Sequence, residues 1–190
     1  MNIFNRNIIL NSRSPRRKQI LSDMGLSVTA VSTDADENCP QDIPAEKKAE
    51  YIAMLKDQAY TLPLAENDVL ISADTVVVCN SMVMGKPKDE TDARRMLKTL
   101  SSNRHSVITG CVVRTPYCRK VFSDITQVYF RELTDEDIEY YIRTKRPFDK
   151  AGSYGIQEWI GMAGIYKIEG DYYNVMGLPA CKVWQTINSI

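Results

Sequence analysis

The stretch VLISADTVVV, residues Val69–Val78, is an apolar and largely β-branched run interrupted by one acid, Asp74. Runs of this kind are typical of central strands whose two faces are both covered. A carboxylate is costly to bury unless it is paired, hydrogen-bonded or bound to a metal ion. We therefore predict a central strand through Val69–Ile71 and Thr75–Val78, with Asp74 at a strand end or facing a cleft. The pattern also fits an aspartate that caps a turn.

Further strands and helices alternate around this run, each identified by its apolar spacing and its start and stop residues. The expected strands are Asn7–Leu10, Val28–Val31, Val107–Val113 and Val121–Phe130. The expected helices are Pro15–Gly25, Ala45–Leu62, Thr91–Leu100 and one that begins at Thr134. The glycine-rich and aromatic tail, Ala151–Ile190, should supply strands and a last helix from Pro179. This order predicts an α/β fold with a mixed, twisted central sheet flanked by helices.

The composition narrows the class of protein. The chain has 190 residues, and we expect residues 1–190 to form a single domain. Lys plus Arg and Asp plus Glu both number 24, so the net charge is zero. A nucleic-acid-binding protein usually carries a basic excess, so we expect no nucleic-acid partner. No stretch approaches the roughly 20 apolar residues that span a bilayer, so we expect no membrane association.

The cysteines and the single histidine indicate where the protein works and which chemistry it lacks. The five cysteines are odd in number and scattered, without a CxxC pair: Cys39, Cys79, Cys111, Cys118 and Cys181. This pattern is unlike a disulfide framework or a zinc site and fits a reducing compartment. The N-terminus lacks the apolar run of a secretory signal, so we predict a cytoplasmic protein. His105 alone leaves few ways to build a histidine-dependent triad.

Positive charge and hydroxyl groups are concentrated in NSRSPRRKQIL, where the first strand passes into the first helix. Ser12, Ser14 and the first N–H groups of the helix can donate to phosphate oxygens, and the helix dipole favours an anion there. Arg16 and Arg17 add planar donors that match phosphate geometry. The stretch is thus a candidate phosphate site. It also fits a solvated basic helix face with a serine cap.

Four more polar residues are candidates for the same chemistry. Glu37 in DADEN is a second carboxylate, and Lys86 in MGKPKD lies in a tight loop shaped by glycine and proline. Lys56 lies between core positions of a helix, and Gln157 ends KAGSYGIQ with an amide that can read a base edge. Each of them alone also fits an ordinary surface residue. Phosphate-rich substrates are usually handled with a divalent cation on oxygen ligands.

Taken together, these motifs resemble the Maf family of nucleoside triphosphate pyrophosphatases. The resemblance runs through nearly the whole chain, in the family's order: NSRSPRRKQIL, ADEN, IAMLKDQA, SADTVVV, MGKPKD, KAGSYGIQ and GDYYNVMGLP. It implies an α/β fold related to the inosine triphosphatases, with a cleft between two lobes. It also implies a homodimer, a divalent cation (Mg²⁺ or Mn²⁺) and a nucleoside triphosphate substrate.

The resemblance also assigns roles to particular residues. It makes Asp74 the proton acceptor, with Glu37 and Asp74 as the ligands of the metal ion. Its specificity positions fall on Arg16, Thr75 and Gln157, and Gln157 would hydrogen-bond the base. The other polar residues that it brings to the site are Ser12, Arg17, Lys56 and Lys86.

Within the family, SPRR, ADT and YGIQ are similar to the branch that prefers dTTP and UTP. The branch that acts on 7-methyl-GTP usually has an aromatic residue, a glutamine and an acid at the corresponding places. Two departures from the family pattern stand out. Asn11 replaces the usual alanine before the first serine, and Asp57 follows Lys56, where pairing between the two would lower the charge of the lysine.

The expected activity is hydrolysis of dTTP and UTP to the nucleoside monophosphate and pyrophosphate. Two alternatives stay open at this point. One is a broader house-cleaning pyrophosphatase for modified pyrimidine nucleotides. The other is a non-catalytic nucleotide-binding regulator of cell division.

Overall fold

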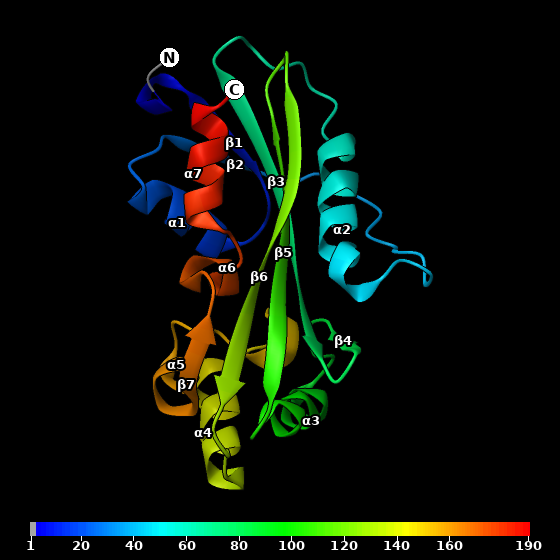
Figure 1. Ribbon diagram of the computed structural model, residues 1–190, viewed down its shortest axis with the longest axis vertical. Coiled ribbons are helices and arrows are strands. Elements are labelled where there is room, and N and C mark those ends of the chain that lie inside the picture. Colours follow the sequence, from blue (N-terminus) through cyan, green and yellow to red (C-terminus); the bar gives the residue numbers. More distant parts are fainter. Residues whose placement is uncertain (1–2) are drawn as a thin grey trace. The chain divides into compact units, whose positions relative to one another are not determined.

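The computed structural model describes residues 3–190, in which seven strands form one mixed sheet (Figure 1). The strand order is β2-β1-β3-β5-β6-β7, and β4 pairs with β3. The strands are β1 (Asn7–Asn11), β2 (Val28–Val31), β3 (Asp68–Cys79), β4 (Met82–Met84), β5 (Arg104–Arg114), β6 (Arg119–Phe130) and β7 (Ile165–Glu169). β1 is parallel to β2 and β3, whereas the β3–β4 and β6–β7 pairs are antiparallel. The predicted α/β class and mixed sheet are therefore confirmed.

Seven α-helices and two short 3₁₀ turns complete the part of the chain from residue 3 onward. The helices are α1 (Pro15–Asp23), α2 (Ala45–Ala59), α3 (Glu90–Leu100), α4 (Asp135–Lys145), α5 (Trp159–Gly164), α6 (Tyr172–Met176) and α7 (Ala180–Asn188). The 3₁₀ turns are η1 (Ile3–Asn5) and η2 (Ala151–Ser153). In the described chain, none of the helices combines the length and the apolar character that a membrane span requires.

Most of the expected elements are present, and their start signals act as predicted. Pro15 begins α1, and Thr134 forms a reciprocal capping box with Asp137 at the start of α4. The expected helix through Leu62 is wrong at its end, because α2 stops at Ala59. The N–H of Tyr60 donates to the carbonyl of Asp57, which tightens the last turn, and Tyr60 is already extended. The sequence analysis also missed β4.

The chain divides into two compact units. Unit 1 comprises residues 1–74, 109–124 and 177–190, and unit 2 comprises residues 75–108 and 125–176. The strands β3, β5 and β6 each contribute residues to both units. The single domain and the cleft between two lobes stay predictions.

Unit 1 is built on the parallel strands β2, β1 and β3 and on the adjoining ends of β5 and β6. In this unit α2 lies on one side of the sheet, and α1 and α7 lie on the other (Figure 1). A Cβ atom at Gly110 of β5 would lie 2.3 Å from the backbone nitrogen of Glu50 in α2. Only glycine therefore allows α2 to pack this closely on the sheet. This packing fixes the helix that carries Lys56.

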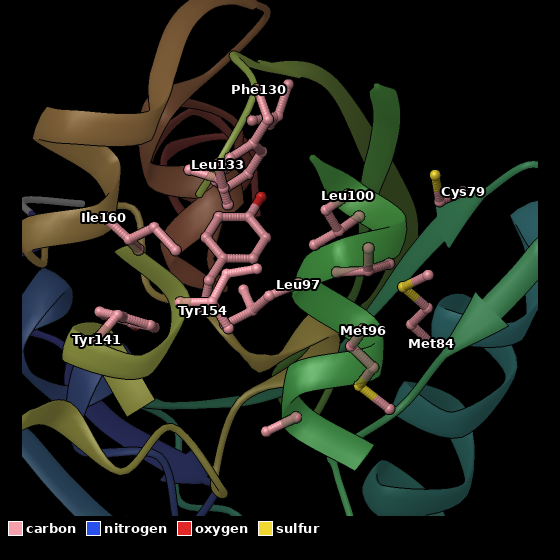
Figure 2. Close-up of a cluster of buried hydrophobic side chains, with 14 of the residues drawn as sticks. Cys79, Met84, Met96, Leu97, Leu100, Phe130, Leu133, Tyr141, Tyr154 and Ile160 are labelled. Carbon is pink, nitrogen blue, oxygen red and sulfur yellow. The ribbon is translucent and has the colours of Figure 1, made fainter. Parts of the chain in front are cut away.

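Unit 2 contains a cluster of buried apolar side chains from β3, α3, β6 and α4 (Figure 2). His105 lies within it and is 1% exposed, with Nε2 2.7 Å from the Tyr154 hydroxyl. The rings of Phe130 and Tyr154 pack against the imidazole. Burial lowers the pKa of His105 from 6.5 to about 3, so the imidazole is neutral in the folded protein at neutral pH.

This neutral histidine predicts a specific loss of stability in acid. Below its ordinary pKa of about 6.5, His105 takes up a proton in the unfolded chain but not in the folded chain, so acid favours unfolding. The loss begins near that value and continues down to the folded pKa of about 3. From about pH 7 to about pH 5, this residue should lower the free energy of unfolding by about 2 kcal/mol. Urea unfolding at the two pH values measures this fall in unfolding free energy.

The comparison variant is His105→Gln, which keeps a polar side chain and cannot titrate. Its unfolding free energy should fall less between the two pH values than that of the wild type. An equal fall in both proteins would show that His105 is not the titrating group.

Candidate functional site

The candidate site in unit 1 lies at the carboxyl ends of β1 and β2 and beside the middle of β3, where its parallel pairing with β1 ends. In β1 and its neighbours, Asn11 is in register with Val31 of β2 and with Ser72 of β3. Open α/β sheets bind ligands beyond these strand ends. Ser12 directly follows β1, and Asp74 lies two residues beyond Ser72 in β3. The topology thus gathers predicted site residues from separate parts of the sequence.

The centre of this site is a lysine between two acids. The Nζ of Lys56, in the last turn of α2, lies 2.7 Å from Asp74 Oδ1 and 3.3 Å from Glu37 Oε1. The side chains of Lys56 and Asp74 are only 15% and 17% exposed, whereas that of Glu37 is 56% exposed. Water therefore screens the Lys56–Asp74 attraction less than it would at an exposed pair. The three predicted residues converge on one point.

Arg17 supports the strand residue that precedes Asp74. Its side chain is buried, and Nη1 donates to the Ala73 carbonyl at 2.9 Å and to Ser12 Oγ at 3.1 Å. Its Nε donates to the Gly177 carbonyl at 2.7 Å. Burial lowers the pKa of Arg17, and the charge of Asp74 opposes that shift. These contacts indicate that Arg17 positions the segment after β1 and the middle of β3.

The hydroxyls before α1 are arranged as a cap. Ser12 Oγ accepts from the Ser14 N–H at 3.1 Å, and Ser14 Oγ accepts from the Arg17 N–H at 3.4 Å. Because both oxygens act as acceptors here, their own hydrogens can still be donated to an anion. Arg16 is half-buried in the first turn of α1. The serine cap considered from the sequence is present, and it leaves the hydroxyl donors available.

Asn11 is a site residue that the sequence analysis noted only as a departure from the family pattern. It is 3% exposed, and its Nδ2 donates to the Lys56 carbonyl at 2.8 Å and to Thr33 Oγ1 at 2.9 Å. Its Oδ1 accepts from the Thr33 N–H at 3.0 Å. The Tyr60 N–H donates to Asp57, so the Lys56 carbonyl would otherwise lack a partner at the helix end. Asn11 thus fixes the turn that carries Lys56.

Three predicted residues belong to unit 2. Thr75 is half-buried in β3 next to Asp74, and Lys86 is exposed in the loop after β4. The Oε1 atom of Gln157 is buried and has no hydrogen-bond partner within residues 3–190. A buried acceptor of this kind is unusual and calls for a partner. That these three residues share a site with the unit 1 residues stays a prediction.

The pairing of Asp57 with Lys56 that the sequence allowed is not formed. Adjacent residues on a helix point in different directions, so their side chains do not face each other. Asp57 is instead 2% exposed, with Oδ1 2.9 Å from Arg114 Nε and Oδ2 3.0 Å from Arg119 Nε. The charge of Lys56 is therefore available to Asp74 and Glu37.

The donor set suits a hard divalent cation. Glu37 and Asp74 offer carboxylate oxygens that already share one positive charge, the Lys56 ammonium. Within residues 3–190 there is no group of three or more His, Cys, Asp or Glu side chains placed to hold a metal ion. Mg²⁺ is commonly held by one or two carboxylates together with substrate phosphates and water. The residues present fit that arrangement.

Comparisons with known proteins agree with the sequence motifs. The family described as Maf-like protein matches residues 7–190. The dTTP/UTP pyrophosphatase of Phocaeicola vulgatus is 46% identical over 96% of this chain and 95% of its own. The protein of the same name from Christiangramia forsetii is 41% identical over 98% and 95%. The Ham1 protein structure from Staphylococcus aureus has a TM-score of 0.42 at 15% identity, over 66% of this chain and 72% of its own.

The Asn11 contacts predict a local effect on α2. In Asn11→Ala the Lys56 carbonyl loses its partner, which should cost about 1–3 kcal/mol of unfolding free energy. Amide hydrogen exchange should speed up in the last turn of α2 and at Thr33. Thr33→Val is the matched control, because it removes the threonine hydroxyl and leaves the Asn11–Lys56 bond. If both variants expose the last turn of α2 equally, Asn11 does not hold Lys56.

Proposed function

Because the chain belongs to the Maf family, we propose that it hydrolyses dTTP and UTP to the nucleoside monophosphate and pyrophosphate. Curated relatives named dTTP/UTP pyrophosphatase, 41–46% identical over most of the chain, support this substrate pair. The observation in the structure that carries the proposal is the Lys56 ammonium held between Glu37 and Asp74, just beyond the point where the parallel pairing of β1 and β3 ends. Together these make the protein a hydrolase acting on an acid anhydride.

Asp74 is the group proposed to take the proton in this reaction. Water adds through its oxygen to phosphorus, the bond between the α and β phosphates breaks, and a proton of the water passes to the Asp74 carboxylate. Lys56, 2.7 Å away, holds this carboxylate in place. Arg17 fixes the preceding residue through the Ala73 carbonyl. A fixed base of this kind needs little rearrangement when the water arrives.

Glu37 and Asp74 are the residues proposed to hold Mg²⁺ or Mn²⁺. When bound, the ion supplies positive charge that offsets the negative charge of the phosphate oxygens. Lys56 already reduces the repulsion between the two carboxylates, which lie within 3.3 Å of its ammonium. It would also lower the repulsion between these acids and an incoming triphosphate.

The remaining polar and charged groups of the site are proposed to bind the phosphates and the base. Ser12 and Arg16 contribute a hydroxyl donor and a permanent positive charge beside the N-terminus of α1. Lys86 is exposed and contributes a further positive charge. Gln157 would receive the base, since its buried Oε1 lacks a donor and both uracil and thymine present an N3–H group. A base without such a donor would leave this acceptor unpaired.

The proposal predicts the outcome of a substrate panel. Purified protein with Mg²⁺ or Mn²⁺ should release pyrophosphate from UTP and dTTP at least about tenfold faster than from ATP, GTP or CTP. Asp74→Asn should lower this turnover by about 100-fold or more, because the proton acceptor is lost. Asp34→Asn, which removes a fully exposed carboxylate, should leave turnover unchanged.

Two results would contradict the proposal. Undiminished turnover in Asp74→Asn would remove the assigned base, and equal turnover of all five nucleotides would remove the substrate preference. Binding of dTTP without hydrolysis by the wild type, with metal present, would instead favour a nucleotide-binding regulator. Faster hydrolysis of modified than of ordinary UTP would favour the house-cleaning alternative.

The cellular setting and the assembly are proposed on the sequence alone. A cytoplasmic location follows from the cysteine pattern, and the homodimer follows from the family resemblance. The zero net charge supports the expectation that the protein acts on free nucleotides and not on nucleic acid.

A further inference from the structure

Unit 1 contains a second feature able to bind a small molecule, a surface pocket of about 590 Å³. The connection between α2 and β3 lines one side of it, and the turn between β5 and β6 lines the other. Its size falls within the range of about 300–1,000 Å³ that is usual for small-molecule sites. None of its lining residues belongs to the candidate catalytic site. The pocket therefore needs an explanation of its own.

Two arginines of this pocket share a single buried acid. The carboxylate of Asp57, 2% exposed, accepts from Arg114 Nε at 2.9 Å and forms an ion pair with Arg119, whose Nε lies 3.0 Å from Oδ2. One negative charge thus faces two positive charges, and the group keeps one unit of net positive charge. A buried carboxylate also restrains the guanidinium groups that it contacts. The excess charge therefore stays at the wall of the pocket.

The donors of the two arginines are used differently. Arg114 also donates to the carbonyls of Asp57 at 3.4 Å and Tyr60 at 3.1 Å, so it closes the end of α2. Arg119 pairs with Asp57 through Nε, its side chain is 36% exposed, and its two terminal amino groups donate no hydrogen bond to any residue from 3 to 190. These groups form one edge of a planar fork that matches a carboxylate or a phosphate. Arg119 is therefore the group that is available to a ligand.

Two large side chains supply apolar surface beside these arginines. Tyr117, in the β5–β6 turn, is 83% exposed, and Leu62, in the α2–β3 connection, is 64% exposed. The Thr115 hydroxyl is occupied by the turn, since it accepts from the N–H groups of Tyr117 and Cys118. Large apolar side chains next to a cationic group suit a ligand that is apolar at one end and anionic at the other.

We propose that this pocket binds a small organic anion, with its carboxylate or phosphate on Arg119 and its aromatic body against Tyr117 and Leu62. The buried Asp57 pre-orients Arg119, so little side-chain freedom is lost on binding. Asp57 directly follows Lys56 in α2, so the pocket and the catalytic site are connected through one helical turn. The pocket is thus a second ligand site, separate from the proposed nucleotide site.

The test uses two probes that share an aromatic ring and differ in the anionic group, phenyl phosphate and phenylacetate. Each probe is titrated into the isotope-labelled protein up to about 10 mM. This concentration nearly saturates a site with a Kd of about 1 mM. The amide signals of residues 61–62, 64, 115 and 117–119 should shift and saturate with at least one probe. Benzyl alcohol, the neutral analogue, should bind at least about tenfold more weakly. The tighter probe identifies the preferred anionic group.

Two variants make the assignment specific. Arg119→Gln removes the charge and should weaken binding at least about tenfold. Lys120→Gln removes the neighbouring charge, which does not line the pocket, and should bind as the wild type does. The fold of each variant is checked from its remaining amide signals. No saturable shift at these residues with either probe, equal binding of benzyl alcohol, or undiminished binding in Arg119→Gln would overturn the proposal.

Discussion

The charge of Asp74 is the constraint around which unit 1 is organised. The preceding residues of β3, from Val69 to Ala73, are fully buried, so the carboxylate emerges from an apolar strand and needs compensation. The chain meets that need with the Lys56 ammonium at 2.7 Å, and Glu37 from a loop shares the same positive charge. An acid held in this way is paired with a cation, fixed in position and only partly exposed. Those are the properties required of a group that activates water or binds a hard cation.

The residues that support Glu37, Lys56 and Asp74 act mainly through hydrogen bonds to backbone carbonyls. Arg17 is buried and holds the carbonyl before Asp74, while Asn11 holds the carbonyl of Lys56 itself. Gly110 allows α2 to pack directly on β5. The two charged side chains thus keep their positions because the strand and the helix that carry them are fixed independently. Loss of Arg17 or Asn11 would therefore displace the charged groups of Asp74 and Lys56 without removing their charges.

The sequence analysis succeeded where the signal is local. The apolar run of β3, the proline at the start of α1 and the threonine at the start of α4 each depend on neighbours in the chain, and all were predicted. It was wrong where the deciding contact is distant. The end of α2 depends on Asn11, 45 residues away, and on Arg114, 54 residues from Tyr60. The partners of Asp57 lie in β5 and β6, and spacing along the helix gives no sign of them.

The sequence motifs pointed to several residues that the fold brings together in unit 1. Among them are Glu37, Lys56 and Asp74. Asn11 was noted only as a departure from the family pattern. Its role depends on the Lys56 carbonyl at the end of α2, and that contact is visible only in the fold. Arg17 was expected to meet phosphate, whereas three of its contacts are made with the chain itself. The motif pattern therefore named residues that lie together, but it did not show which of them make their contacts with the chain itself.

The account depends on Glu37 and Asp74 forming one cation-binding pair, and a Mn²⁺ titration tests this most directly. Calorimetry in the presence of a non-hydrolysable dTTP analogue would compare the wild type with Glu37→Gln, Asp74→Asn and the exposed control Asp34→Asn. We predict that the first two variants bind Mn²⁺ at least about tenfold more weakly and that the control binds as the wild type does. Unchanged Mn²⁺ affinity in both Glu37→Gln and Asp74→Asn would contradict the account.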